Sequence, residues 1–449
     1  MNKKIVNLLN GKSENHIMPF LWMHGEDEET IRNYVRVVKK ANCHAVCVES
    51  RPHPDFCGPG WWNDLGIVLD EARNLGMKVW ILDDSHFPTG YANGALKDKP
   101  AKLHRQFIYS KSFVTKYEQE KIEFDLTKIM KPEFIPNNML EKYVLSEQID
   151  SFQHFDDDAI LSVIAVSRDG KETISIAFSV EGKMEWNKPV GEYTIWIIGK
   201  TRNLGPHREY INMLDRDSCR ILIDTVYESH YAHFKEYFGN TIAGFFSDEP
   251  ELGNGHLYCH DQSIGSDIDL PYSDELERRL NDKLHHKWLD MAYMLWDNMS
   301  DKEITAKIRY VYMDQMTSLV SETFSKQVGD WCYEHGVQYI GHLIEDNNAH
   351  ARTGSSLGHY FRGLWGQDMA GIDDIGGQVL PQGENEPYYG KYGVKRDGEF
   401  YHFQLGNLAA SAAAIDPKKN GNAMCEIFGN YGWQDPRAVV IKNGVYVTP

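Results

Sequence analysis

Acidic side chains stand at the end of an apolar run in the segment 242–252, which reads IAGFFSDEPEL. The run leads directly into Asp248 and Glu249, and Pro250 follows. Because proline lacks a backbone N–H and stops a strand's hydrogen-bond ladder, the two carboxyl groups are expected at the end of a strand. Side chains alternate along a strand, so we expect Glu249 to face a substrate and Asp248 to brace a neighbouring loop.

Two further glutamates occupy the same kind of position. The run 337–346 (VQYIGHLIED) carries Glu345 near its end, and the run 422–433 (NAMCEIFGNYGW) carries Glu426. A pair of carboxyl groups can hydrolyse a glycosidic bond, one protonating the leaving oxygen and the other acting as base or nucleophile. A crowd of like charges also raises the pKa of one member, which keeps that acid protonated near neutral pH. The candidate catalytic residues are therefore Glu249, Glu345 and Glu426.

Other polar or aromatic residues near strand ends are predicted to hold substrate hydroxyl groups or to support the carboxylates. These candidates are His24, Glu49, Asp83, Asp84, Asp248, His342, Asp346, Trp365 and Asp373. Each acid or histidine alone is as often a helix cap, an ion-pair partner or a satisfied loop residue, so only their convergence on one face favours function. Tryptophans in Gly-rich loops either pack the loops or stack on sugar faces, because an aromatic ring offers a large apolar face.

The elements that must position these residues alternate between strands and helices. Apolar runs at 17–23, 44–50 and 77–84 are separated by helical patterns at 26–41 and 65–75. This alternation is typical of a parallel sheet with crossover helices. In a (β/α)8 barrel of the TIM type, catalytic groups lie at the carboxyl ends of the strands. The sequence therefore predicts an α/β fold of this type.

Residues 105–205 interrupt the alternation with short runs separated by charged or Gly/Pro turns, several of them alternating apolar and polar residues. We expect a small antiparallel β domain here, inserted after strand 3. The catalytic barrel then comprises residues 1–104 with strands 1–3 and residues 206–449 with strands 4–7, including a long helical stretch at 273–335. Asn443-Gly444 predicts a hairpin near the end. An eighth βα unit is hard to fit, so the barrel is expected to close irregularly or to be incomplete at strand 8.

Composition excludes several classes of partner. The chain has 65 acidic residues against 47 Lys and Arg, a formal net charge of −18, which disfavours nucleic acid and anionic membranes and suits a neutral carbohydrate. Seven cysteines without a CxxC pair favour a reduced chain. The sequence shows no signal-peptide core and no apolar stretch of about 18 residues, so we expect a cytoplasmic protein. The oligomeric state is not readable from the sequence.

Two alternatives use the same residues. A metal-dependent sugar isomerase or epimerase would employ Glu249, His342, Asp373 and Glu426 as ligands, because hard divalent cations favour carboxylates. The sequence has no HxH or HExxH pair to support it, and otherwise leaves the metal ligands unknown. A non-catalytic carbohydrate-binding barrel would keep the aromatic loops without needing several acids.

Six motifs, in order, give the chain a resemblance to a known family. They are PFLWMHG, WILDDSHFPTGYANG, FFSDEPELG, WCYEHGVQYIGHLIED, GIDDIGGQVLP and CEIFGNYGW, spread over about residues 17–433. This set resembles glycoside hydrolase family 106 and its relatives, the α-L-rhamnosidase-like barrels. The resemblance implies an inverting glycosidase with appended β domains and a bound calcium ion, although no calcium loop of EF-hand spacing is present. The proposed hydrolysis itself requires no cofactor.

The resemblance also implies roles for the three glutamates. Glu249 is similar to the general acid, Glu345 to the base that activates water, and Glu426 to a further carboxylate of the active site. In other glycosidase barrels, which act with retention, a glutamate after strand 7 is the nucleophile. Glu426 therefore remains the alternative to Glu345 as the second catalytic carboxylate. Inverting pairs lie about 6.5–9.5 Å apart and retaining pairs about 5–5.5 Å. We predict the wider separation for Glu249 and Glu345.

Overall fold

The computed structural model describes most of the chain. The described residues are 16–129, 155–202, 209–253, 264–298, 300–343, 356–375 and 399–428, with Val6, Leu9, Asn10, Thr353 and four short strand segments at 388–389, 395–396, 440–442 and 445–447.

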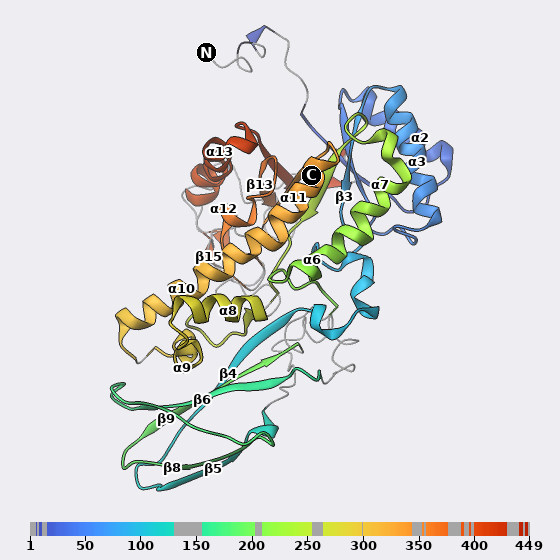
Figure 1. The fold of residues 1–449 in the computed structure, drawn as a ribbon. Helices are drawn as coiled ribbons and strands as arrows, with labels where there is room; N and C mark the ends of the chain where they lie inside the picture. The colour runs from blue at the N-terminus through green and yellow to red at the C-terminus, as the bar shows by residue number, and fades with distance from the viewer. Residues whose placement is uncertain are drawn as a thin grey trace.

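A parallel sheet of five strands forms the upper part of the molecule in Figure 1. In spatial order the strands are β1 (Phe20–Trp22), β2 (Ala45–Glu49), β3 (Lys78–Leu82), β10 (Ile242–Asp248) and β12 (Gln338–His342), and each neighbouring pair is parallel. Two more parallel strands, β13 (Ala370–Ile375) and β16 (Ala423–Phe428), pair with each other. The Asp368 N–H, two residues before β13, donates to the carbonyl of Tyr339 on β12 at 2.7 Å, so this pair continues the row.

The row of strands curves around a shared apolar interior. Phe20 on β1 and Phe246 on β10 are separated by two strands in the sheet, yet their ring centroids are 5.4 Å apart across the concave face. The same cluster holds Cys47, Trp80, Ile340 and, partly buried, Met424. Among the described residues no strand joins β16 to β1, so the expected closed (β/α)8 ring is not observed. The fold is mixed α/β, with a curved row of parallel strands and a separate antiparallel sheet.

Helices cover the convex face of the sheet (Figure 1). They include α2 (Glu28–Lys40), α3 (Pro59–Asn74), α6 (Arg216–Leu222), α7 (Glu228–Phe234), α10 (Lys302–Val320) and α11 (Lys326–Glu334). Caps fix several starts: the Asp27 side chain accepts from the Thr30 N–H before α2, and Asp301 accepts from two N–H groups before α10.

The helical stretch predicted at 273–335 is not continuous. Its first part is α8 (Asp274–Lys283), and the left-handed residues His285 and His286 end it before α9 (Trp288–Met291). A left-handed backbone cannot continue an α-helix. The apolar stripe does not reveal such a break, because it records which side chains are apolar and not the conformation of the backbone. The stripe therefore predicted the helices but not their breaks.

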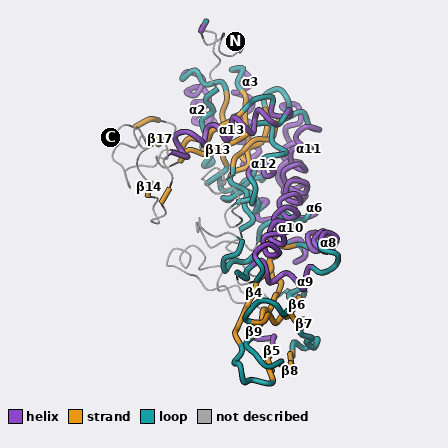
Figure 2. The backbone as a smooth tube through the Cα atoms, turned by 90° about the vertical axis from the view of Figure 1, so that its left-hand side faces the viewer, coloured by secondary structure: helices purple, strands orange, loops and turns teal. Residues whose placement is uncertain are grey.

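An antiparallel sheet forms the lower part of the molecule in Figures 1 and 2. Its order is β11 (Leu270–Tyr272), β4 (Gln106–Val114), β9 (Tyr193–Thr201), β6 (Ala159–Ser167) and β7 (Thr173–Ser175), and β5 (Lys121–Asp125) pairs with β8 (Lys183–Asn187) beside it. The antiparallel pairing expected for this region is observed. The strand β11 is a difference from the expectation, because it comes from the chain after β10, where the sequence predicts only a loop.

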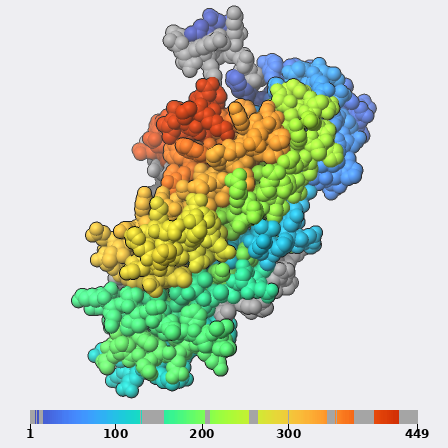
Figure 3. All heavy atoms as spheres, in the orientation of Figure 1, coloured from blue at the N-terminus to red at the C-terminus, as the bar shows by residue number. Residues whose placement is uncertain are grey.

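The two sheets are in contact through residues that follow β11. Residues after β11 pack on the antiparallel sheet, where the rings of Trp196 and Tyr293 lie 6.3 Å apart, and Figure 3 shows this segment (yellow) lying directly against it (green). At the end of the chain, β17 (Val440–Lys442) and β18 (Val445–Val447) pair antiparallel around the predicted hairpin turn. Within the described residues, no helix combines the length and apolar character needed to span a membrane.

Candidate active site at the carboxyl ends of the parallel strands

The concave face of the sheet changes from apolar to polar over one step along four of the parallel strands. Because side chains two residues apart share a face, the residue two positions after each interior apolar residue stands above it. These steps are Cys47 to Glu49, Phe246 to Asp248, Ile340 to His342 and Met424 to Glu426, whereas Phe20 is followed by Trp22 and Trp80 by Leu82. Glu49, Asp248, His342 and Glu426 therefore form one polar layer above the apolar interior.

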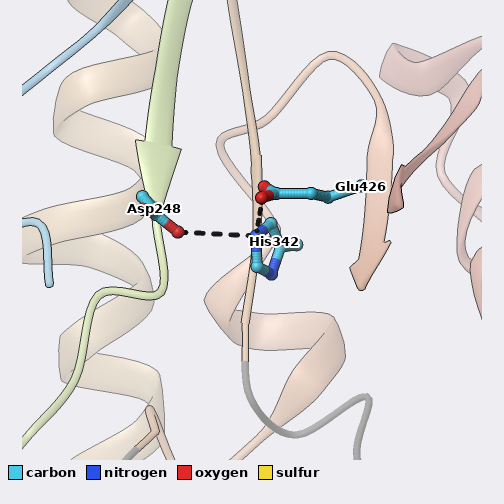
Figure 4. Close-up of side chains that lie close together, drawn as sticks. All are labelled: Asp248, His342 and Glu426. Atoms are coloured by element: carbon cyan, nitrogen blue, oxygen red, sulfur yellow. Dashed lines mark hydrogen bonds and ion pairs between the residues drawn. The ribbon is translucent and has the colours of Figure 1, made fainter. Parts of the chain in front are cut away.

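His342 lies at the centre of this layer. Its Nε2 is 2.9 Å from Oε2 of Glu426 and 3.6 Å from Oδ1 of Asp248, so one imidazole ring joins β10, β12 and β16 (Figure 4). The ring is 1% exposed. Burial alone would lower the pKa of His342, but the hydrogen bond to Glu426 and the surrounding carboxylates raise it well above its usual value. The neighbouring carboxylates therefore favour the protonated form of the ring.

Glu249 and Asp373 complete the cluster. One oxygen of each lies within 4.8 Å of the other and of a ring nitrogen of His342. Glu249 has φ of 45°, a left-handed conformation that breaks the alternation of the strand directly after Asp248. Both consecutive carboxylates therefore reach His342, in contrast to the expectation that only one of them would face the site.

Asp248 also braces a loop, as the sequence predicts. Nη2 of Arg51 lies 2.6 Å from Oδ2 of Asp248, and Nε of Arg51 lies 2.7 Å from Oε1 of Glu49 at the end of β2. Glu49, Arg51, Asp248, His342 and Glu426 thus form a row of alternating charge across four strands. Arg51 is absent from the residues predicted from the sequence, because a lone arginine in a turn-rich loop gives no signal of its own.

The acids of the cluster differ from ordinary carboxylates. Burial raises the pKa of Asp373 to about 7 even though the charge of His342 opposes the rise. Burial likewise raises the pKa of Glu49 to about 7, against the opposing charge of Arg51, and raises the pKa of Asp248. Groups of this kind can hold a proton near neutral pH, which is what a general acid must do.

Asp83 and Asp84 are directed away from this cluster. Oδ2 of Asp83 accepts a hydrogen bond from the Tyr227 hydroxyl at 2.6 Å on the helical side of the sheet, and its Oδ1 accepts from Thr89 at 2.7 Å. The carboxylate of Asp84 accepts from the backbone N–H groups of Gly90, Ala92 and Asn93. Both acids are fully buried and shape the loop after β3.

The remaining predicted residues lie elsewhere. His24 is exposed, with its Nδ1 2.9 Å from Glu26. Trp365 precedes β13 and so lies near the amino ends of the strands, on the opposite edge from Asp373. Glu345 and Asp346 lie outside the described residues, so the predicted separation of Glu249 and Glu345 stays a prediction.

Two overlapping sets of atoms have the spacing of metal ligands. They are Asp248, His342 and Glu426, and Glu249, His342 and Asp373, with the ligand atoms of each set within 4.8 Å of one another. Both sets include an imidazole, whereas calcium takes oxygen ligands. The described donors therefore do not fit a calcium site and would better suit manganese or zinc. A protonated His342 could not ligate either ion, so binding would require loss of that proton.

Comparisons with known proteins show which solved structures have a similar fold. No family model matches the sequence, and no curated protein matches it. Among solved structures, a rhamnosidase from Novosphingobium sp. PP1Y superposes on 94% of this chain with a TM-score of 0.54 and 11% sequence identity. The match covers 53% of the rhamnosidase, so the chain spans about half its length. At this identity the likeness shows a shared fold.

A second solved structure superposes less closely. The catalytic domain of the beta-amylase from Paenibacillus polymyxa covers 91% of this chain and 85% of its own length, with a TM-score of 0.42 and 10% identity.

Proposed function

We propose that this chain is a glycoside hydrolase that cleaves a neutral glycan by carboxylate acid–base catalysis. One observation carries the proposal: acids from β10, β13 and β16 converge on His342 at the carboxyl ends of curved parallel strands. Glycosidic hydrolysis needs such a group of carboxyls, some protonated and some ionised. The likeness of the fold to a rhamnosidase supports this class, and with the six motifs it supports an α-L-rhamnosidase-like enzyme related to family 106.

The proposed mechanism inverts the configuration at the anomeric carbon of the sugar. Glu249 donates its proton to the leaving oxygen, while a base removes a proton from the water that attacks the anomeric carbon. The resemblance gives the role of base to Glu345. Glu426 is the alternative, because its Oε2 lies 2.9 Å from Nε2 of His342 within the same carboxylate cluster. The proposed ring is a (β/α)8-type barrel incomplete at strand 8, with the site in its mouth.

A screen of aryl glycosides, including α-L-rhamnosides, tests the proposal, with NMR detection of the first-formed anomer. We expect turnover with inversion, and at least about a 10²-fold loss of rate for Glu249→Gln and Glu345→Gln. Asp374→Asn is the matched control, because this neighbour of Asp373 alternates to the other side of β13. Absence of turnover on every glycoside would contradict the proposal, and retention with a larger loss for Glu426→Gln would transfer the second role to Glu426.

A metal-dependent sugar isomerase or epimerase is the second candidate, favoured by the two sets of ligand-spaced atoms around His342. Chelation separates the two functions. A hydrolase of the proposed kind retains its rate after EDTA treatment, whereas an isomerase loses it and regains it when manganese or zinc is restored. The assay for the second candidate follows interconversion of free aldose and ketose by NMR.

A further inference from the structure

Trp22 stands beside the polar layer of the site although no catalytic role requires it there. The register pairs Phe20 with Cys47, Leu21 with Val48 and Trp22 with Glu49. Phe20 and Cys47 belong to the apolar interior, whereas Leu21 and Val48 pack under the helices. By alternation Trp22 shares the concave face with Glu49. Its side chain is nevertheless 47% exposed, so a large indole face is open at the mouth of the site.

Phe87 is a second open aromatic ring on the same side. It belongs to the loop after β3, which Asp83 and Asp84 hold through hydrogen bonds to Thr89, Gly90, Ala92 and Asn93. Phe87 is 42% exposed, and the guanidinium carbon of Arg51 lies 5.6 Å from its ring centroid. The two buried acids that follow β3 therefore fix the loop that carries this ring.

The two rings flank one ion pair. Trp22 neighbours Glu49 in the register, Glu49 pairs with Arg51 at 2.7 Å, and Arg51 lies against Phe87. Arg51 in turn lies 2.6 Å from Asp248, which belongs to the carboxylate cluster. The mouth thus has an aromatic side at β1–β3 and a carboxylate side at β10–β16.

From this arrangement we propose that Trp22 and Phe87 form a binding subsite for one pyranose ring beside the carboxylates. The C–H face of a pyranose stacks on an aromatic ring, and the neighbouring Glu49–Arg51 pair offers an acceptor and a donor to its hydroxyl groups. This charged pair favours a ring rich in hydroxyls over a purely apolar ligand. This inference rests on the proposed function and deepens it by assigning the residues that hold the sugar.

The other described tryptophans show that this exposure is unusual. Trp61, Trp80, Trp288, Trp296 and Trp331 are buried in the core, and Trp62, Trp186 and Trp196 are partly buried. Trp365 is as open as Trp22, at 54% exposure, but lies near the amino ends of the strands. It is therefore a matched control: the same residue type and a similar exposure, on the opposite edge of the sheet from the carboxylate cluster.

Saturation-transfer NMR on the full chain tests the subsite. The Glu249→Gln enzyme, which binds without turnover, is titrated with the methyl glycosides of α-L-rhamnose, α-D-glucose and β-D-galactose, and the aromatic protons are saturated. We expect transfer to the C–H protons of one face of the bound ring. In this background, Trp22→Ala and Phe87→Ala should each weaken binding by at least about fivefold. Trp22→Phe should stay within about twofold of the parent, and Trp365→Ala should have no effect.

The outcomes separate the subsite from the hydrolase. Equal affinity in Trp22→Ala, Phe87→Ala and the parent overturns the subsite, and turnover of aryl glycosides by the wild type then leaves the hydrolase standing. An equal loss in Trp365→Ala also overturns it. If no sugar binds the Glu249→Gln enzyme, the subsite is overturned, and absence of turnover in the wild type overturns the hydrolase as well.

Discussion

At the scale of single residues, His342 allows the carboxylates to stay close together. It contributes positive charge between Asp248 and Glu426, and its charge lowers the pKa of both Asp248 and Asp373 against the effect of burial. Without this cation the acids would repel one another in a partly buried layer, and some would take up protons. The imidazole is thus a positioning group for the cluster.

His342→Gln should lower the activity and change its pH dependence. Glutamine keeps a hydrogen-bond donor for Glu426 but removes the charge, so the pKa values of Asp248 and Asp373 rise further. We expect a fall of about 10–10² in kcat/KM and a shift of the acidic limb of the pH profile to higher pH. Rate measurements from pH 4 to 9 on both proteins check this. An unshifted acidic limb would show that the charge of His342 does not change the pKa of the group whose ionisation produces that limb.

Asp373 makes a separate prediction about stability. Its folded-state pKa of about 7 lies above the ordinary value of 3.8, so between these values the folded chain holds a proton that the unfolded chain has released. The free energy of unfolding must therefore fall as pH rises through this window. Relative to Asp373→Asn, the wild type should lose up to about 1.4 kcal/mol per pH unit. Urea unfolding at pH 5 and pH 8 measures the difference, and a pH-independent difference contradicts the assignment.

Sequence patterns locate strand ends but not the direction of a side chain at those ends. Asp83 and Asp248 both follow an apolar run, yet Asp83 accepts hydrogen bonds under the helices while Asp248 faces His342. Alternation failed at Glu249 because a left-handed backbone turns its side chain. Arg51 gave no signal because its role depends on Asp248, almost 200 residues further along the chain.

At the scale of elements, glycines bring the strands of the site together. A Cβ on Gly371 of β13 would lie 1.7 Å from the carbonyl oxygen of Gly341 on β12. Gly341 has φ of 149°, and a Cβ there would lie 2.2 Å from the Ser247 oxygen on β10. No side chain fits at either contact, so the spacing that brings Asp373 to His342 depends on these two residues.

Gly371→Ala should therefore destabilise the fold and displace Asp373. The overlap is with backbone and cannot be relieved by a rotamer change, so we expect a loss of about 3 kcal/mol or more. Gly406→Ala is the control: it lies in α13 (Leu405–Ile415), and its Cβ would meet nothing within 4 Å. In a helix that change should stabilise by about 0.5–1 kcal/mol. Thermal unfolding of both variants tests the contrast, and equal melting temperatures would refute the close contact.

The seven parallel strands could be predicted because each is an apolar run bounded by turn formers or acids. The strand β11 could not, because its three residues pair with β4, more than 150 residues earlier. A local pattern carries no record of such a partner. Because the pairing with β11 is not visible in the local sequence, residues 105–205 look like an independent insert.

At the scale of the whole molecule, the two sheets share one core. Ile108, Ile164 and Ile198 of the antiparallel sheet belong to the same apolar cluster as Leu270 and the residues under the parallel sheet. A smaller cluster that includes Ile195 fills the other face of the antiparallel sheet. Because apolar contacts run unbroken from one sheet to the other, the stability of each depends on the other.

The protein should consequently unfold in one cooperative transition rather than as a barrel with a separate β domain. Ile198→Ala in the shared core and Ile195→Ala in the smaller core should each remove about 2–5 kcal/mol. Both should move the same calorimetric transition, because loss of the antiparallel sheet exposes apolar surface of the shared core. Differential scanning calorimetry with hydrogen exchange measures this. A second transition, shifted by Ile195→Ala alone, would show that the antiparallel sheet is an autonomous domain and that β11 merely rests on it.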